Sequence, residues 1–227
     1  MPLGSTPACS FATRRALIRA FTASARRKAR YGLFASLYTD RGSHYFTTPE
    51  AGGKVDKVNL TQVGRSLKQL GIGHIGAYSP EARGRSERAF QTHQGRLPQE
   101  LARAGITDMQ SANQYLEQVY RLAHNREFCV ASTLPASAFV PFISGTLPDI
   151  LCQQHERTVN NDNCVSFEGL SLQIPADEFR YHYVRTQVRV HRYYDGTLAL
   201  FHGPRKLAAY GQNGKKTSFM EVLKLAA

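Results

Sequence analysis

The pattern of apolar residues changes near Asn125, and this change divides the chain into two parts of different architecture. Before it, short apolar runs at 33–38 and 74–78 flank a stretch, 61–71, in which apolar residues recur at helical spacing. Alternation of helices and strands is typical of an α/β layer. After it, prolines lead into short segments in which apolar and polar residues alternate, as they do in strands. We therefore expect an α/β part followed by an all-β part.

The all-β part is predicted to form a small barrel. Apolar residues alternate with polar ones over 165–174 and again over 188–200, and turn-forming residues separate these runs. Asp195-Gly196, which lies between two alternating runs, is a strong signal for a hairpin. Several short strands in so short a stretch favour a small barrel.

Five segments follow from these patterns. We expect a basic leader at 1–30, an α/β domain at 31–128, a proline-marked linker at 129–150, a β-barrel at 151–210 and a flexible tail at 211–227. Within the α/β domain, helices are predicted over 61–71, from Ser79 to about Leu97, and from Ser111 to His124. Ser79 and Pro80 suit the start of the second helix, as a capping residue and a proline at the first position.

The positive charge of the chain is concentrated at its two ends. With 29 Lys and Arg against 17 Asp and Glu, the formal charge is +12. Residues 1–34 hold seven basic residues and no acid, and residues 205–227 hold five basic residues and one acid. This balance favours a polyanionic partner, with nucleic acid ahead of a membrane surface. No apolar run approaches the ~20 residues needed to cross a bilayer, so a membrane-spanning protein is excluded.

The acid-free, Arg-rich leader has two interpretations. It has the composition of an organellar transit peptide, which would make the chain an imported protein. It can equally be a chance leader ahead of a domain, and we favour this second interpretation. The four scattered cysteines, which form no CxxC pair, argue against a disulfide scaffold or a zinc ribbon and fit a reducing compartment.

Two carboxylates have positions that suit metal chemistry. Asp40 closes a predicted buried strand, and Glu87 lies inside a predicted helix. A carboxylate at a sheet edge and one on a flanking helix can converge on a metal ion in an α/β fold. By spacing alone we favour the ordinary explanations, in which Asp40 is a turn residue before Gly42 and Glu87 is one charge on a solvated helix face.

The sequence around these two acids resembles that of bacterial insertion-sequence transposases with a retroviral-integrase-type catalytic core, and is most similar to the ISNCY-like group. The resemblance rests on Tyr38-Thr39-Asp40-Arg41-Gly42-Ser43-His44-Tyr45-Phe46 and on Tyr78-Ser79-Pro80-Glu81-Ala82-Arg83-Gly84-Arg85-Ser86-Glu87-Arg88-Ala89-Phe90. It extends over roughly residues 30–210 and includes the predicted barrel, which looks like the small DNA-contacting barrel of the family.

The resemblance implies a ribonuclease H-like core, present here only in part because its first strands are missing. It implies that Asp40 and Glu87 are the second and third acids of a catalytic Asp-Asp-Glu triad that binds Mg²⁺. It further implies DNA cleavage and strand transfer in transposition, with insertion-sequence ends and target DNA as partners. A bacterial, cytoplasmic and nucleoid-associated protein that can form homo-oligomers fits this family, and no membrane partner does.

The first acid of the triad has no counterpart in this sequence, since no Asp or Glu precedes Asp40. We therefore expect an N-terminally truncated transposase in which two acids hold Mg²⁺ weakly or not at all and which is catalytically inactive alone. Two cations ~3.5–4 Å apart repel each other strongly unless carboxylates lie between them. The alternative is a non-catalytic DNA-binding module or an inhibitor of intact transposase.

Two groups of residues are candidates for contact with DNA. On the helix that carries Glu87, side chains at spacings of three, four and seven share a face, and flanking arginines can contact phosphate. In the barrel region, cations are interleaved with aromatic residues. The candidates are Arg83, Arg85, Arg88, Gln91, Gln94, Arg189 and Arg192. The alternative is a solvated helix face and exposed strand positions.

Overall fold

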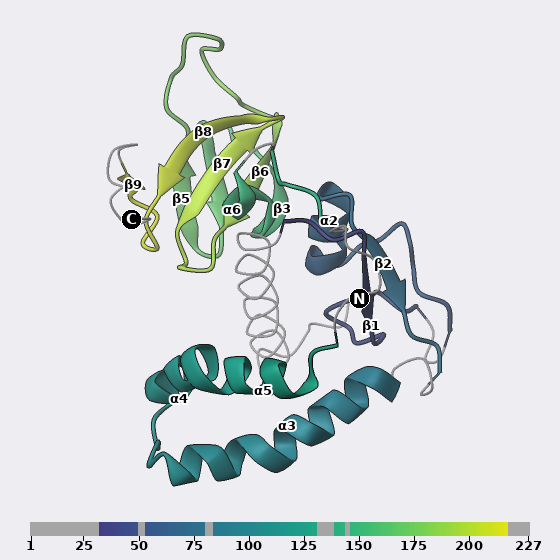
Figure 1. Cartoon of the computed structure of the whole chain (residues 1–227). Helices are drawn as coiled ribbons and strands as arrows, with labels where there is room; N and C mark the ends of the chain where they lie inside the picture. The colour runs from purple at the N-terminus through teal and green to yellow at the C-terminus, as the bar shows by residue number, and fades with distance from the viewer. Residues whose placement is uncertain (1–31, 50–52, 80–83, 131–138, 144–145, 218–227) are drawn as a thin grey trace. The chain divides into compact units, whose positions relative to one another are not determined.

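The computed structural model describes residues 32–49, 53–79, 84–130, 139–143 and 146–217 (Figure 1). Its contacts divide the chain into two compact units. The first comprises residues 1–75 and 139–227, and the second comprises residues 76–138. The predicted leader at 1–30 lies outside the described residues.

The first unit begins with a short α/β segment. Strand β1 (Ser36–Thr39) pairs with strand β2 (Gly73–Gly76), and helix α2 (Gln62–Gln69) lies between them in sequence. The side chain of Thr61 caps α2 by accepting a hydrogen bond from the Gly64 amide at 3.1 Å. The helix ends at Leu70, and Gly71 follows with φ of +70°, the left-handed conformation that ends many helices. The predicted helix at 61–71 is thereby confirmed.

A small apolar core holds this segment to the later part of the first unit. The apolar face of α2 is buried together with Ile72 and with Leu151, which follows the short helix α6 (Leu147–Ile150). Each fully buried aliphatic side chain of this kind contributes about 1.5–3 kcal/mol. The buried residues of this core are Val63, Leu67, Leu70, Ile72 and Leu151.

Arg65 adds a polar connection between α2 and the start of the sheet. Its guanidinium donates to the carbonyl oxygens of Cys152 at 2.5 Å and Ile150 at 3.2 Å, and also to Gln69 at 2.7 Å. Burial lowers the pKa of Arg65 to about 10, so the group remains charged at neutral pH. Segments almost 90 positions apart in sequence are thus joined by a charged side chain that donates to the backbone of the later one.

The all-β part contains a five-stranded antiparallel sheet and a separate hairpin. The order in the sheet is β3-β6-β7-β8-β9, and β4 pairs only with β5. The strands are β3 (Gln153–Thr158), β4 (Cys164–Phe167), β5 (Leu170–Gln173), β6 (Gln187–Arg192), β7 (Leu198–His202), β8 (Arg205–Tyr210) and β9 (Lys216–Thr217). The inward side chains of both sheets form the larger core, which includes Val165, Leu172, Val188, Val190, Leu200 and Tyr210.

The predicted small barrel is, in the residues that the structure describes, an open antiparallel sheet and not a closed barrel. A barrel requires the two outer strands to hydrogen-bond to each other, whereas β3 and β9 form the two ends of the sheet. Strand β9 has only two residues, and the β4–β5 hairpin is hydrogen-bonded within itself. The alternating pattern correctly indicates half-buried strands, but it carries no information about whether the first and last strands pair.

The hairpin predicted at Asp195-Gly196 is confirmed, since β6 and β7 are antiparallel neighbours. Gly196 has φ of +86°, a conformation that favours glycine. The Asp195 carboxylate accepts hydrogen bonds from the amide and the hydroxyl of Thr197. The stretch after Tyr210, expected to be a flexible tail, pairs as far as Thr217: β9 extends the sheet beside β8.

The second unit is helical. It contains α3 (Gly84–Arg103), α4 (Met109–Tyr115), the π-helical turn η2 (Leu116–Tyr120) and α5 (Arg121–Phe128). Helix α3 continues through Pro98 instead of stopping near Leu97 as expected, and the predicted start at Ser79 and Pro80 falls partly outside the described residues. The helices are joined by polar contacts, among them Arg96 to Glu127 at 2.9 Å.

The mixed α/β architecture expected from the sequence is confirmed. The ribonuclease H-like core stays a prediction, and so do the five segment boundaries. Among the described residues, no helix combines the length and the apolar character needed to cross a membrane.

Candidate functional site

Asp40 lies directly after β1, in a tight loop of the first unit. Its Oδ1 accepts a hydrogen bond from the Gly42 amide at 3.1 Å, and the side chain is half-buried. The Gly42 carbonyl in turn accepts from the amides of Tyr45 at 2.8 Å and Phe46 at 3.0 Å. The carboxylate is therefore held at the end of the strand by the backbone of its own loop.

The loop is attached to β2 through His74. The Thr39 hydroxyl lies 2.9 Å from His74 Nε2, and the His74 ring stacks on Phe46 with centroids 4.0 Å apart. Burial lowers the pKa of His74, so the imidazole is neutral at physiological pH. The residue before Asp40 is thus connected to β2, the strand that pairs with β1.

Glu87 lies in the first turns of α3, in the second unit. Its side chain is exposed, as are those of Arg88, Gln91 and Gln94 on the same helix. Glu87, Gln91 and Gln94 all lie on α3, so the helical spacing expected for these three residues is confirmed. Arg83 and the side chain of Arg85 lie outside what the structure describes. Because Asp40 and Glu87 belong to different units, their convergence on one metal ion stays a prediction.

The chemistry of the two acids fits Mg²⁺, but their number does not complete a metal centre. Carboxylate oxygens are among the preferred protein ligands of Mg²⁺, which uses one or two of them together with water. Within the described residues, no three or more His, Cys, Asp or Glu side chains are grouped so that they could hold a metal ion. A two-metal site would need further acidic ligands.

Arg189 and Arg192, the two arginines of the all-β part that were predicted to contact DNA, lie on β6 and bond to other residues of the protein. Arg189 donates to the Gly203 carbonyl at 2.5 Å, and Arg192 forms an ion pair with Glu168 at the turn of the β4–β5 hairpin. Three positions apart on one strand, they point to opposite faces of the sheet. Arg192 therefore connects the hairpin to the sheet, and contact of either arginine with DNA stays a prediction.

Other aromatic and basic residues of the stretch 189–194, which covers the end of β6 and the start of the turn after it, are also structural. His191 is 4% exposed and stacks on Phe201, with centroids 4.0 Å apart. Tyr193 donates its hydroxyl to the Asp149 carboxylate, and burial with this contact raises its pKa. Of this run, Tyr194 remains largely exposed, in the β6–β7 turn.

The connection between β5 and β6, residues 174–186, presents exposed aromatic and basic side chains that were not selected from the sequence. Figure 1 shows it as a green extension beyond the end of the sheet. Phe179 is 76% exposed and Tyr181 is 99% exposed, with Arg180 exposed between them. Large exposed aromatic rings flanked by cations are typical of surfaces that stack on nucleic-acid bases. The signal in the sequence was the run Phe179-Arg180-Tyr181-His182.

This connection is anchored at its base. Tyr183 is fully buried and donates its hydroxyl to Asp177 at 2.6 Å, a hydrogen bond that lowers the pKa of the Asp177 carboxyl. Arg205 on β8 pairs with the same carboxylate at 3.2 Å and lies 4.3 Å from the centre of the Phe179 ring. The exposed rings are thus presented from a fixed base.

Comparison with known proteins points to one functional class. No protein-family model matches the chain. It is 30% identical over 172 residues to y4bF of Sinorhizobium fredii, which is named as a transposase; the match covers 74% of this chain and 36% of that protein. It is 29% identical over 174 residues to the transposase for insertion sequence IS1202 of Streptococcus pneumoniae, covering 76% of this chain and 37% of that protein. The chain thus spans little more than a third of the length of these relatives.

Proposed function

We propose that this chain, which is related to the transposases of bacterial insertion sequences, is a DNA-binding segment of such an enzyme and carries two of its metal-binding acids. The relationship supports a role in transposition. The proposed DNA contact rests on the exposed rings of Phe179 and Tyr181 beside Arg180. The assignment to the ISNCY-like group is part of the proposal.

In this proposal the β5–β6 connection stacks on DNA bases, and the basic ends of the chain bind phosphate. The described part of the all-β region has nearly balanced charge, so most of the electrostatic attraction comes from residues 1–34 and the C-terminal lysines. Arg88, Gln91 and Gln94, all exposed on α3, add contacts along the backbone.

Asp40 and Glu87 would hold Mg²⁺, with Asp40 oriented by the Gly42 amide. When bound, Mg²⁺ supplies Lewis-acid activation of a phosphodiester. Without a third acid, the chain alone positions DNA but does not cut it. It then acts as a DNA-binding module, or as an inhibitor that competes with an intact transposase for element ends.

The first prediction concerns the exposed ring of Tyr181. Replacing it in Tyr181→Ala should weaken binding of the full chain to DNA by roughly 5- to 150-fold, because one stacked base contributes about 1–3 kcal/mol. The measurement is fluorescence anisotropy with labelled DNA. Tyr194→Ala is the matched control, since Tyr194 is also exposed but lies in the turn at the opposite end of β6. Equal effects of the two variants would contradict the proposed stacking surface.

The second prediction separates binding from catalysis. Binding of the full chain to a short DNA duplex should weaken steeply with salt, because each neutralised phosphate releases a counterion. The same preparation should leave supercoiled DNA uncut in Mg²⁺ or Mn²⁺. Binding that is absent or insensitive to salt would overturn the DNA-binding proposal. Metal-dependent nicking that is lost in Asp40→Asn would overturn the proposal that the chain is inactive alone.

A further inference from the structure

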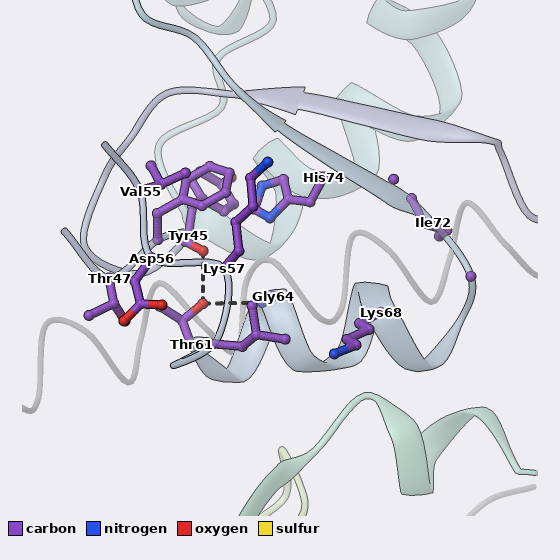
Figure 2. Close-up of a pocket in the computed structure, with 14 residues that line it drawn as sticks. Tyr45, Thr47, Val55, Asp56, Lys57, Thr61, Gly64, Lys68, Ile72 and His74 are labelled. Atoms are coloured by element: carbon purple, nitrogen blue, oxygen red, sulfur yellow. Dashed lines mark hydrogen bonds between the residues drawn. The ribbon is translucent and has the colours of Figure 1, made fainter. Parts of the chain in front are cut away.

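A pocket of about 470 Å³ opens beside the loop that carries Asp40 (Figure 2). Its walls come from residues 45–47, residues 55–61, α2 and β2, all within the first unit. Its volume lies in the range of about 300–1,000 Å³ that is usual for small-molecule sites. None of the residues that the sequence analysis proposed for DNA contact or for the metal lines it.

One wall of the pocket is aromatic. The rings of Phe46 and His74 stack with an interplanar angle of 19°, and Tyr45 meets His74 edge-on with centroids 5.8 Å apart. Thr61 fixes the backbone here, because its hydroxyl donates to the Tyr45 carbonyl at 2.8 Å while it caps α2. These rings form a preassembled surface against which a planar group can pack.

Two lysines from different elements line the same pocket. Lys57 precedes α2 and Lys68 lies on it, and both side chains are exposed. In the part of the chain that the structure describes, neither lysine forms an ion pair with a carboxylate. The one acid in the lining, Asp56, already accepts hydrogen bonds from the Val58 amide at 2.7 Å and from the Asn59 side chain at 2.7 Å. The pocket therefore offers unneutralised positive charge beside an aromatic wall.

The pocket and Asp40 share a structural element. His74 belongs to the aromatic wall, and its Nε2 lies 2.9 Å from the hydroxyl of Thr39, the residue before Asp40. Phe46 and Tyr45 bond through their amides to the carbonyl of Gly42, whose own amide donates to Asp40. A group bound in the pocket would thus lie against the same loop that orients the candidate metal ligand.

We propose that this pocket holds one unpaired nucleotide of a DNA strand, with the base against the aromatic wall and a phosphate near Lys57 or Lys68. The inference rests on the proposed function and names a subsite for it. A nucleotide combines a planar π-face with an anionic phosphate, and these are the two features that the lining complements. The pocket would fix one strand relative to Asp40, so both lysines and the aromatic wall are positioning groups.

The test compares binding of the full chain to an oligothymidylate strand and to a duplex. Lys57→Glu and Lys68→Glu should each weaken binding of the single strand about tenfold more than Lys54→Glu does. Lys54 is the matched control, because it is exposed on the same segment but does not line the pocket. Lys68→Arg should retain most of the binding. An abasic strand of equal length should bind about tenfold more weakly than oligothymidylate, since it lacks the stacking base.

A second measurement locates the strand directly. A strand containing 4-thiothymidine should photocrosslink to the peptide that includes Tyr45 and Phe46 or to the one that includes His74. Crosslinks confined to other peptides would overturn the proposal. So would equal losses in the Lys54, Lys57 and Lys68 variants, or displacement of the strand by thymidine monophosphate at equal concentration, which would assign the pocket to a free nucleotide. If the chain binds no DNA of any kind, the proposed function fails instead.

Discussion

His191 illustrates at the scale of a single residue how burial decides chemistry. It lies on β6 among aromatic and basic residues that suggest a contact surface, yet it is almost fully buried. Neither of its ring nitrogens has a hydrogen-bond partner among the described residues. Burial lowers the pKa of His191 to about 4, so the ring is neutral at pH 7. Its role is to pack against Phe201 rather than to bind phosphate.

This burial predicts a dependence of stability on pH. The unfolded chain takes up a proton at His191 below the ordinary pKa of about 6.5, while the folded chain does so only near pH 4. The free energy of unfolding should therefore be unaffected above pH 6.5 and should fall as the pH drops toward 4, by about 2–3 kcal/mol in total. Urea unfolding at pH 7.5 and pH 4.5 measures this loss.

His191→Phe is the control for that experiment, because phenylalanine keeps the stack on Phe201 and cannot titrate. Between pH 7.5 and pH 4.5, the variant should lose less free energy of unfolding than the wild type, and the difference should be most of the ~2–3 kcal/mol assigned to His191. His155, whose pKa burial also lowers, accounts for a remaining part in both proteins. If wild type and variant lose equal stability, His191 is not protonated on unfolding as described.

Asp40 and Glu87 were selected from the sequence by their motifs, and the structure supplies a physical setting for only one of them. The Gly42 amide orients Asp40, whereas Glu87 projects from an exposed helix face. The motif indicates residue type and order. It does not indicate which loop hydrogen bonds hold the side chain, because these depend on backbone conformation.

At the scale of the elements, turns were predicted well and edge strands poorly. The β6–β7 hairpin follows from Asp195-Gly196, whose chemistry is local. Strand β3, with the sequence Gln-Gln-His-Glu-Arg-Thr, shows no apolar alternation. It is a strand because its backbone pairs with β6 along its whole length at the edge of the sheet. Pairing of this kind is invisible in the side-chain pattern of the strand itself.

The turn at Gly196 provides a prediction at this scale. Gly196→Ala should lower the free energy of unfolding by about 1–2 kcal/mol, because alanine is strained at φ of +86°. A Cβ there would also lie 3.2 Å from the side chain of Gln212. Thermal unfolding followed by circular dichroism measures the change.

Gly95→Ala is the matched comparison. Gly95 lies on an exposed part of α3, and apart from its chain neighbours and the nearby backbone of the helix, a Cβ there would meet no atom of the described residues within 4 Å. Alanine should therefore stabilise the helix, by up to about 1 kcal/mol. A destabilisation of similar size in both variants would show that conformation at Gly196 is not the cause.

At the scale of the whole molecule, burial is distributed unevenly between the two units. The larger core lies between the five-stranded sheet and the β4–β5 hairpin. In the second unit, Ala77 and Tyr120 are the buried apolar residues among those described, and Phe90, Val119 and Leu122 are about half exposed. Helices that bury little apolar surface gain little stability from packing.

This difference predicts unequal protection of backbone amides. Hydrogen exchange of the full chain should be slow in β6 and β7, where opening requires global unfolding, and faster by several orders of magnitude in α3 and α4. Peptide-resolved mass spectrometry of the exchanging protein provides the measurement. Equal protection of α3 and β7 would contradict this prediction, because it would require the helices to be packed against a further surface.

Local signals in the sequence are enough to predict the capped helix α2, the β6–β7 hairpin, the alternation of inward apolar residues, and two acids in motifs that resemble those of transposases. Long-range packing is needed to explain that the sheet stays open at β3 and β9, that Arg189 and Arg192 bond within the protein, and that an aromatic, lysine-bearing pocket forms beside the loop that carries Asp40. The reason is physical. Caps, turns and periodicity depend on neighbours a few positions apart, whereas strand partners, burial and pockets depend on residues that only folding brings together.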